Sequence, residues 1–361
     1  MLPCGKTFDM IKITRIGRDC FMKSNKKKKR NQRKQRRLLL SLLLLVGTGI
    51  FLGTATYAWF TANKTVSVNP IDVNVAAKSG LQISADGQNW KSILTTTDIT
   101  GAQGNYAAAK NQLPAMLEPV STAGIMDAGG TMDMYLGEVS SNTSGDWVLS
   151  SSKLTDKNGT EGSYVAYDIF LRTETEAPIY LTTNSGVTFK DEQDTGIKNA
   201  TRVAFAVLGN TTSDDTISNI QGLNNGASSP VTIWEPNYDA HTSYGVANAR
   251  DTYGIGDLTA GTGNDLVPYD GIKNEFNSDA NITLGNANAT ESSDNFQKVT
   301  PQITTEVDFS DYKQLITLSK GVTKVRVYMW IEGQDVDCEN NASGGNISFD
   351  LQFSTSDSAG A

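Results

Sequence analysis

Three carboxylates near the C-terminal end of the chain have a spacing that suggests chemistry. Asp335, Asp337 and Glu339 alternate in the stretch GQDVDCEN. On a strand, alternate residues point to the same side, so these carboxylates would repel one another unless a cation relieved the repulsion. Ca²⁺ prefers oxygen ligands, which makes the three residues weak calcium candidates. The register of an EF-hand loop is absent, and a solvated acidic loop without a cofactor is the default interpretation.

The chain has a single histidine, His241, in the stretch NYDAHTSYG. Ser243 and Asp239 are close to it in sequence, but a catalytic triad is defined by geometry and not by adjacency in a polar loop. We interpret His241 as an ordinary surface histidine. A zinc site would need further histidines or a cysteine pair, and no phosphate-binding loop is recognisable. The protein is therefore not expected to be an enzyme.

Charge is distributed unevenly along the 361 residues. Residues 1–58 contain 14 basic and 2 acidic side chains, which leaves 17 basic and 37 acidic side chains for the remainder. A body this acidic would repel nucleic acid, so nucleic acid is not expected as a partner. Cys338 is the only cysteine beyond residue 58, and we expect its thiol to be buried and unreactive.

The basic residues lead into an apolar segment. Lysine and arginine are dense over residues 23–37, and an apolar run over residues 38–53 follows. This is the layout of a secretory signal, but residues 38–60 are also long enough to cross a membrane as a helix. The segment is thus either a cleaved signal or a single-pass anchor. The small residue Ala58, directly before Trp59, favours cleavage between these two residues.

Residues 1–21 precede this signal and have no helical or strand pattern. Met22 opens a more ordinary signal sequence, MKSNKKKKR, so we interpret residues 1–21 as an extension upstream of the true start. The expected organisation is an export segment over residues 22–58 and an extracellular or surface-bound body over residues 59–361.

The junction GTATYAWFTANKTVSV resembles that of the TasA/camelysin-type secreted proteins of Gram-positive bacteria. The resemblance implies a cut between Ala58 and Trp59 and an exported β-sandwich that forms fibres, as in a biofilm matrix, or decorates the cell surface. It also implies that the first residues of one subunit complete the sheet of the next. The stretch over residues 322–354 is similar to the ending of uncharacterised exported proteins of anaerobic Gram-positive bacteria, which implies no activity.

Period-two alternation of apolar residues dominates the body. The clearest stretches are TVSVNPIDVNVAA, RVAFAVLG, KVRVYMWIEG and NISFDLQFS. Strands are also predicted by LQISADGQNWKSI, which reads as a hairpin around Asp86-Gly87, by VTIWEP, and by YVAYDIFLRTE and PIYLTT, which are rich in aromatic and β-branched residues. Half-buried strands present one apolar face each, so two sheets must pack together. The expected fold class is all-β, an antiparallel β-sandwich of jelly-roll type. Trp330 is opposite in phase to Val327 and Met329, so one face of its strand is expected to be less buried.

Helical signals are poor. Residues 105–117 are expected to form at most one or two helical turns before Pro114 ends them. Two tracts rich in Asn, Gly, Ser and Thr, residues 209–230 and about 237–295, interrupt the strands. This composition favours turns. We expect short strands or hairpins within them, or a polar insertion over about 209–295 at one end of the sandwich.

We expect the body to be a self-associating structural protein of the cell surface or extracellular matrix. Residues 59–75 form an extended segment in which Val66, Val68, Val73 and Val75 alternate, and it could pair with the sheet edge of a neighbouring copy. An ordinary first strand of the chain's own sandwich is the competing interpretation. The alternative function is an adhesin or carbohydrate-binding module that recognises a surface glycan or a matrix protein through the long polar loops.

The secreted form of the protein is expected to begin at Trp59, because the small Ala58 precedes the site of cleavage. Mass spectrometry of the intact secreted chain measures this directly. A chain that retains residues 38–60 would show instead that the segment is a membrane anchor.

Overall fold

The computed structural model describes residues 66–68, 72–75, 81–141, 147–253, 255–277, 294–303 and 314–355. These residues belong to the second of two compact units, Thr56–Ala361. The expected cleavage site between Ala58 and Trp59 and the apolar segment over residues 38–60 lie outside the described part of the chain. None of the helices that are described is long and apolar enough to cross a membrane.

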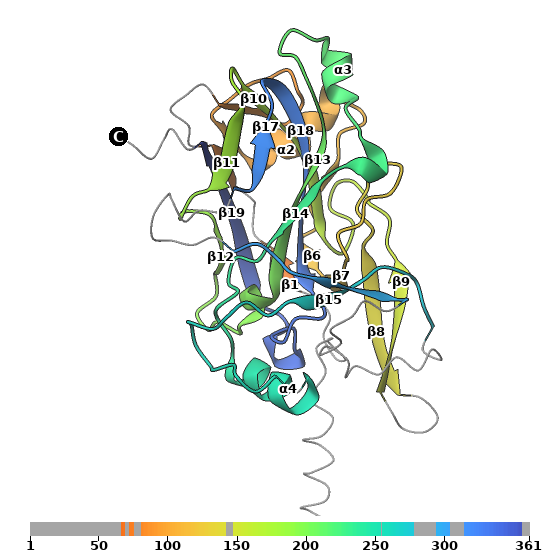
Figure 1. Cartoon of the computed structure of the whole chain (residues 1–361), viewed down its shortest axis with the longest axis vertical. Helices are drawn as coiled ribbons and strands as arrows, with labels where there is room; N and C mark the ends of the chain where they lie inside the picture. Colours follow the sequence, from red (N-terminus) through yellow and green to blue (C-terminus); the bar gives the residue numbers. More distant parts are fainter. Residues whose placement is uncertain are drawn as a thin grey trace, which may run out of the picture. The chain divides into compact units, whose positions relative to one another are not determined.

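Two large sheets make up most of this unit (Figure 1). The strands of the first sheet are β1 (Val66–Val68), β2 (Asp72–Val75), β4 (Ile93–Leu94), β6 (Met116–Leu117), β11 (Ala177–Leu181), β12 (Gly186–Phe189), β17 (Ile316–Leu318) and β19 (Asn346–Thr355). Their order is β17-β11-β19-β1-β6, with β12 and β2 also paired to β19 and β4 paired to β2. We call this sheet the β19 sheet.

The second sheet is called the β18 sheet. Its strands are β3 (Gln82–Ser84), β5 (Asn111–Gln112), β7 (Pro119–Ser121), β8 (Tyr135–Ser141), β9 (Trp147–Lys153), β10 (Val165–Thr173), β13 (Thr201–Thr211), β14 (Val231–Trp234) and β18 (Gly321–Glu332). The order is β14-β13-β18-β7-β8-β9, and β10 pairs with β18, β3 and β5. The long strands β10, β13, β18 and β19 all coincide with stretches in which alternation predicted a strand.

Smaller elements lie in the connections between the strands. The helices are α2 (Thr96–Gly101), α3 (Ile217–Gln221) and α4 (Ser243–Tyr253), and short 3-10 turns cover Ala102–Gly104, Ile197–Ala200, Gly226–Ser228 and Asn340–Ala342. A two-stranded sheet is formed by β15 (Tyr269–Ile272) and β16 (Phe296–Val299). Both α4 and β15 lie in the second polar tract, so the expected short strands are present and an unexpected helix accompanies them.

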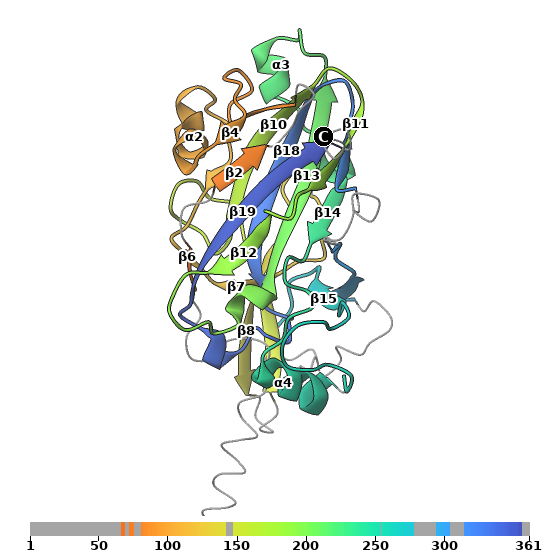
Figure 2. The ribbon, with the colours of Figure 1, turned by 90° about the vertical axis from the view of Figure 1, so that its left-hand side faces the viewer.

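The two large sheets share one hydrophobic core. Ile347, Phe349, Leu351 and Phe353 of β19 are buried, as their alternation predicts, and belong to the same cluster as the apolar side chains of β13 and β18. The rings of Phe205 on β13 and Phe353 meet edge to face, with centroids 5.8 Å apart. Figure 2 shows β19 in front of β13 and β18. Burial of each such aromatic side chain contributes about 1.5–3 kcal/mol.

The other face of the β18 sheet is covered as well, so the expectation of a less buried face around Trp330 is wrong. Trp330 and Tyr328 lie in a second hydrophobic cluster with Met126 and Met132. The backbone N–H of Met132 donates a hydrogen bond to the Tyr328 hydroxyl at 3.0 Å. All 12 residues of β18 are buried. The segment that carries Met126 and Met132 covers the face of β18 that the alternation of apolar residues alone would assign to solvent.

The fold class is confirmed in its coarser part: the described chain is mostly β. It is not purely antiparallel, because β1 and β2 run parallel to β19 and β7 runs parallel to β18. The helical turns expected over residues 105–117 are absent, and β5 and β6 lie there instead. The helical turns occur just upstream, in α2, where Thr95 and Asp98 form a capping box. This reciprocal pair of hydrogen bonds stabilises the first turn of a helix.

Truncation of Phe205 to alanine is expected to lower the free energy of unfolding by about 3–5 kcal/mol, because the side chain is buried between the two sheets. Urea unfolding of the wild type and of Phe205→Ala measures the difference. Tyr244→Ala is the control, since Tyr244 is exposed and its removal should change stability by less than about 0.5 kcal/mol. Equal losses for the two variants would contradict a shared core at Phe205.

Candidate functional site

The predicted assembly strand lies inside the β19 sheet of its own chain. β1 and β2, which contain Val66, Val68, Val73 and Val75, pair in parallel with β19. On their other side, β1 pairs with β6 and β2 pairs with β4, each over two residues. The far edge of β19 is occupied by β11 and β12. Within one chain the segment therefore has the position that the competing interpretation assigns to it.

The position of β1 and β2 also defines a slot. Without them, one edge of β19 over residues 346–353 would have unpaired backbone N–H and C=O groups. Such an edge is a template for another strand. The two short strands on the far side of the slot each expose an apolar residue, Ile93 of β4 at 52% and Met116 of β6 at 55%. We call residues 346–353, β4 and β6 the β19 slot.

The three calcium candidates lie in a turn and not on a strand, because β18 ends at Glu332. Asp335, Asp337 and Glu339 are only 5%, 1% and 3% exposed. The predicted solvated acidic loop is therefore wrong. The sequence reasoning had no signal for this burial, since alternating acidic residues after a strand are normally at the surface.

These carboxylates have basic partners within the chain. Arg202 Nη2 lies 2.6 Å from Asp335 Oδ2. His241 Nδ1 lies 2.7 Å from Asp337 Oδ2. Ca²⁺ needs about six to eight converging oxygen ligands, and over the described ranges no group of three or more His, Cys, Asp and Glu is placed to hold a metal ion. The geometry matches internal ion pairs and does not fit a calcium site.

His241 is buried, at 6% exposure, so its interpretation as a surface histidine is wrong. Asp337 Oδ1 accepts hydrogen bonds from the backbone N–H and the hydroxyl of Thr242, at 2.9 and 2.8 Å. The Thr242 hydroxyl in turn accepts from the N–H of Gly245 in α4. Asp337 thus fixes both His241 and the first turn of α4. A carboxylate at this end of a helix is also favoured by the helix dipole.

Two further acids complete the group. Glu235 follows β14 directly, and its Oε1 lies 2.9 Å from Arg202 Nη2. Glu332, the last residue of β18, accepts hydrogen bonds from the indole N–H of Trp330 and the backbone N–H of Gln334. We use the name carboxyl cluster for the five buried acids Glu235, Glu332, Asp335, Asp337 and Glu339.

Burial changes the proton affinity of this cluster. It raises the pKa of Glu235 to about 8, although Arg202 opposes the shift. It raises the pKa of Glu332 to about 7. Burial, with the charge of Asp337 beside it, raises the pKa of Glu339 to about 8. For His241, burial acts to lower the pKa, but the hydrogen bond and charge of Asp337 outweigh it and raise the pKa. Burial therefore favours the protonated form of these acids.

Cys338 lies within the same turn and is fully buried, as predicted. Burial and the surrounding carboxylates raise the pKa of its thiol. The thiolate is the reactive form of cysteine, so this thiol is unreactive while the turn is intact.

The cavity beside the Asp337–His241 pair is small. His241 lines a cavity of about 10 Å³, together with Arg202, Glu235 and Tyr269. This is about the space that one water molecule needs, so a substrate does not fit. The lining residues include no Ser, Thr or Cys nucleophile. Asp239, a neighbour in sequence, instead receives a hydrogen bond from Gly263.

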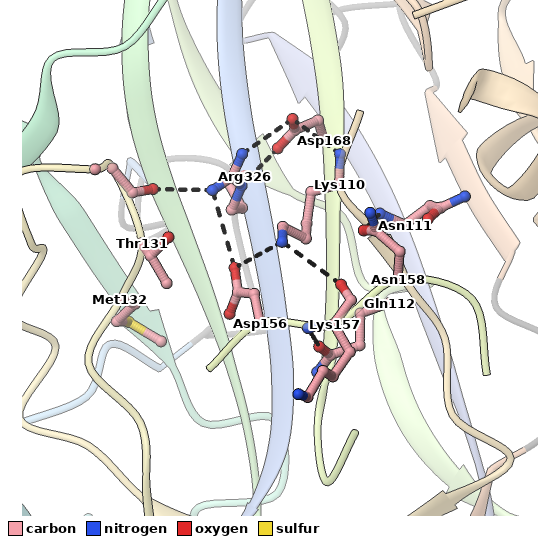
Figure 3. Close-up of polar contacts among 12 residues, drawn as sticks. Lys110, Asn111, Gln112, Thr131, Met132, Asp156, Lys157, Asn158, Asp168 and Arg326 are labelled. Atoms are coloured by element: carbon pink, nitrogen blue, oxygen red, sulfur yellow. Dashed lines mark hydrogen bonds and ion pairs between the residues drawn. The ribbon is translucent and has the colours of Figure 1, made fainter. Parts of the chain in front are cut away.

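A second buried ionic group lies on the outer face of the β18 sheet (Figure 3). Arg326 on β18 binds both oxygens of Asp168 on β10, at 2.6 and 3.1 Å. It also donates to the carbonyl of Gly130 at 3.0 Å and lies 4.0 Å from Asp156. Lys110 lies 3.5 Å from Asp156. The group therefore ties three connecting segments to the sheet.

This Arg326 group was missed by sequence reasoning, although a signal existed. Asp168 and Arg326 each interrupt an apolar run and are register partners on neighbouring antiparallel strands. Burial acts against the ionised carboxylate, but the charges of Arg326 and Lys324 outweigh it and hold the pKa of Asp168 below its ordinary value. Two opposite charges at matching positions of two apolar strands indicate a buried pair.

Comparison with protein-family models, with curated proteins and with solved structures finds no match to this chain. The functional argument therefore depends on the residues and geometry described above.

Asp168→Asn is expected to lower the free energy of unfolding by about 3–5 kcal/mol, because it leaves Arg326 and Lys324 buried without a counter-charge. Chemical denaturation measures the loss. Asp251→Asn is a matched control, since it breaks an Arg–Asp pair that is largely exposed and such pairs contribute little. If both substitutions had the same small effect, the buried pair would not be a stabilising element.

Proposed function

We propose that this chain is an exported structural protein of the cell surface or extracellular matrix, which associates with copies of itself by exchange of its N-terminal strands. The signal-like segment and the resemblance at the junction around Trp59 support export. Two sheets around one core support a jelly-roll-like β-sandwich as the body.

The observation that carries the proposal is the β19 slot. The N-terminal segment lies between β19 and two strands of two residues each, and does not form a long hairpin with a neighbour in sequence. Its main-chain hydrogen bonds to β19 are of the kind that an added strand makes in β-augmentation. A strand from another copy would find the same partners in the same register.

Strand exchange would use the same main-chain contacts that β2 makes within its own chain. The hydrogen bonds between β2 and residues 350–353 are the same whether β2 comes from the same chain or from a neighbour. Exchange of an identical element between protomers is a low-cost route to assembly. The balance between the two forms is then set by protein concentration and by the segment that links β2 to the body.

One observation favours the alternative function, recognition of a glycan or another polar ligand. A polar hollow of about 350 Å³ lies beside α2, lined in part by Asp86, Asn89, Lys91, Asp98 and Asn105. It lies outside the polar insertion that the sequence suggested for recognition. Asp86 already accepts hydrogen bonds from both Asn89 and Asn105, so these contacts compete with a ligand.

Cysteine cross-linking distinguishes exchange from pairing within one chain. Asn74 and Gln352 are register partners between β2 and β19. One preparation carries Asn74→Cys and a second carries Gln352→Cys, both with Cys4→Ser and Cys20→Ser. When the two are mixed, allowed to assemble and oxidised, we expect a disulfide-linked pair of chains, because the strand of one copy reaches the β19 slot of the other.

The matched control replaces Gln352→Cys with Asp350→Cys, since Asp350 is the register partner of Asp72 and not of Asn74. This pair should cross-link much more slowly. A single chain with both Asn74→Cys and Gln352→Cys tests the register itself. If that chain closes its own disulfide while the mixed preparations never link, the strands stay in their own chain and the proposal fails.

A further inference from the structure

The segment that carries α4 is attached to the turn after β18 by buried polar groups as well as by apolar contacts. Asp337 binds His241 and Thr242, directly before α4. Asn248 on α4 is buried and lies beside Glu339. The apolar part of this contact is one cluster, in which Ala249 of α4 and Val336 of the turn are buried and Ile255 and Leu258 pack against them. Titratable side chains of the carboxyl cluster therefore form part of the attachment.

The packing at this contact is tight, and Asp337 is almost fully buried. A Cβ atom built on Gly245 would lie 2.2 Å from Asp337 Oδ1. Only glycine allows α4 to approach the carboxylate this closely. Asp337 is consequently held closely by protein groups, His241 and Thr242 among them.

The charges of the cluster do not balance. Five buried carboxyl groups face two basic partners in the described ion pairs, Arg202 and His241. Buried carboxylates without a counter-charge carry a large desolvation cost. In addition, Glu235 Oε2 and Glu339 Oε1 have no hydrogen-bond partner in the described structure. Each of these oxygens is a place where a proton would remove a buried charge.

We propose that the carboxyl cluster is a proton-binding site, and that bound protons keep the α4 segment attached to the turn after β18. Loss of these protons leaves an excess of buried negative charge, which is relieved when α4 separates and water enters. This proposal is independent of strand exchange, since it concerns the turn after β18 and not the β19 slot.

The groups that face the cluster come from all the elements packed around it. They are Arg202 of β13, Glu235 after β14, His241 before α4, Asn248 of α4, Tyr269 of β15, Glu332 of β18, and Asp335, Asp337, Cys338 and Glu339 of the turn. Arg202 stays charged throughout, because the neighbouring acids raise its pKa further. The titrating groups are therefore the acids and His241.

The sign of the pH dependence follows from proton linkage. Glu235 and Glu339 have a folded pKa of about 8, above the ordinary value of 4.5. Between these values the closed form binds more protons than the open form, so the closed form loses stability as pH rises. The raised pKa of His241 acts in the same direction, since its stabilising charge is lost as pH rises through the folded pKa. Opening is thus favoured by alkaline pH.

Cys338 provides a built-in reporter, because the thiol is buried in the same turn. In the full chain with Cys4→Ser and Cys20→Ser it is the only thiol. Its rate of reaction with an aromatic disulfide reagent is measured from pH 6 to pH 8.5 and divided by the rate of the urea-unfolded chain at each pH. We expect protection to fall at least about tenfold over this range, since each proton released contributes up to tenfold per pH unit.

Glu235→Gln with Glu339→Gln mimics the protonated acids and should keep Cys338 protected at pH 8.5. Glu176→Gln is the matched control, because Glu176 is exposed and its amide should leave the wild-type profile unchanged. Protection that is constant with pH in the wild type, or that falls equally in the double variant, overturns the proposal. If the double variant does not fold, the wild-type profile decides alone.

Discussion

β18 runs through the middle of the protein with apolar residues on one face and Lys324, Arg326 and Glu332 on the other. Both faces are buried, so each of these charges needs a partner inside the protein, because an unpaired buried charge is strongly unfavourable. Asp168 on the neighbouring strand supplies one such partner. The segments around Gly130 and Asp156 supply others. The irregular segments around Gly130 and Asp156 therefore cover β18 and provide partners for its buried charges.

The Arg326 group and the carboxyl cluster around Arg202 differ in how their buried charges are balanced. Around Arg326, basic and acidic groups are present in similar number, and the pKa of Asp168 is held low, so the carboxylate stays charged. Around Arg202, acids are in excess and their pKa values are raised. The first group stabilises the sheet across a wide pH range. The second makes its part of the fold sensitive to protons, and it lies where the polar insertion joins the sheets.

The long strands β10, β13, β18 and β19 could be predicted from the sequence, whereas β8 and β9 were not predicted. Alternation reports local burial, as on the core face of β19. What could not be predicted depends on distant chain segments. Tyr328 accepts a hydrogen bond from Met132, 196 positions earlier, and Trp330 lies in the same cluster as Met126 and Met132. His241 and Asp337 meet across 96 positions of sequence. The helix α4 lies in a polar tract, where Asp337 and Thr242 stabilise its first turn. The sequence of α4 has no helical period of apolar residues from which the helix could be predicted.

In the strand exchange proposed above, the donated strands β1 and β2 and the β19 slot that accepts them are different surfaces of one chain. A chain that donates its N-terminal strand to one neighbour and accepts a strand from another has two unlike ends, so the contact is head-to-tail. Such a filament is polar: one terminus always presents an empty groove and the opposite terminus a free tail. A copy without its tail could still accept a strand but could not pass one on. It would act as a chain terminator, which means that cleavage inside the tail is enough to limit filament length.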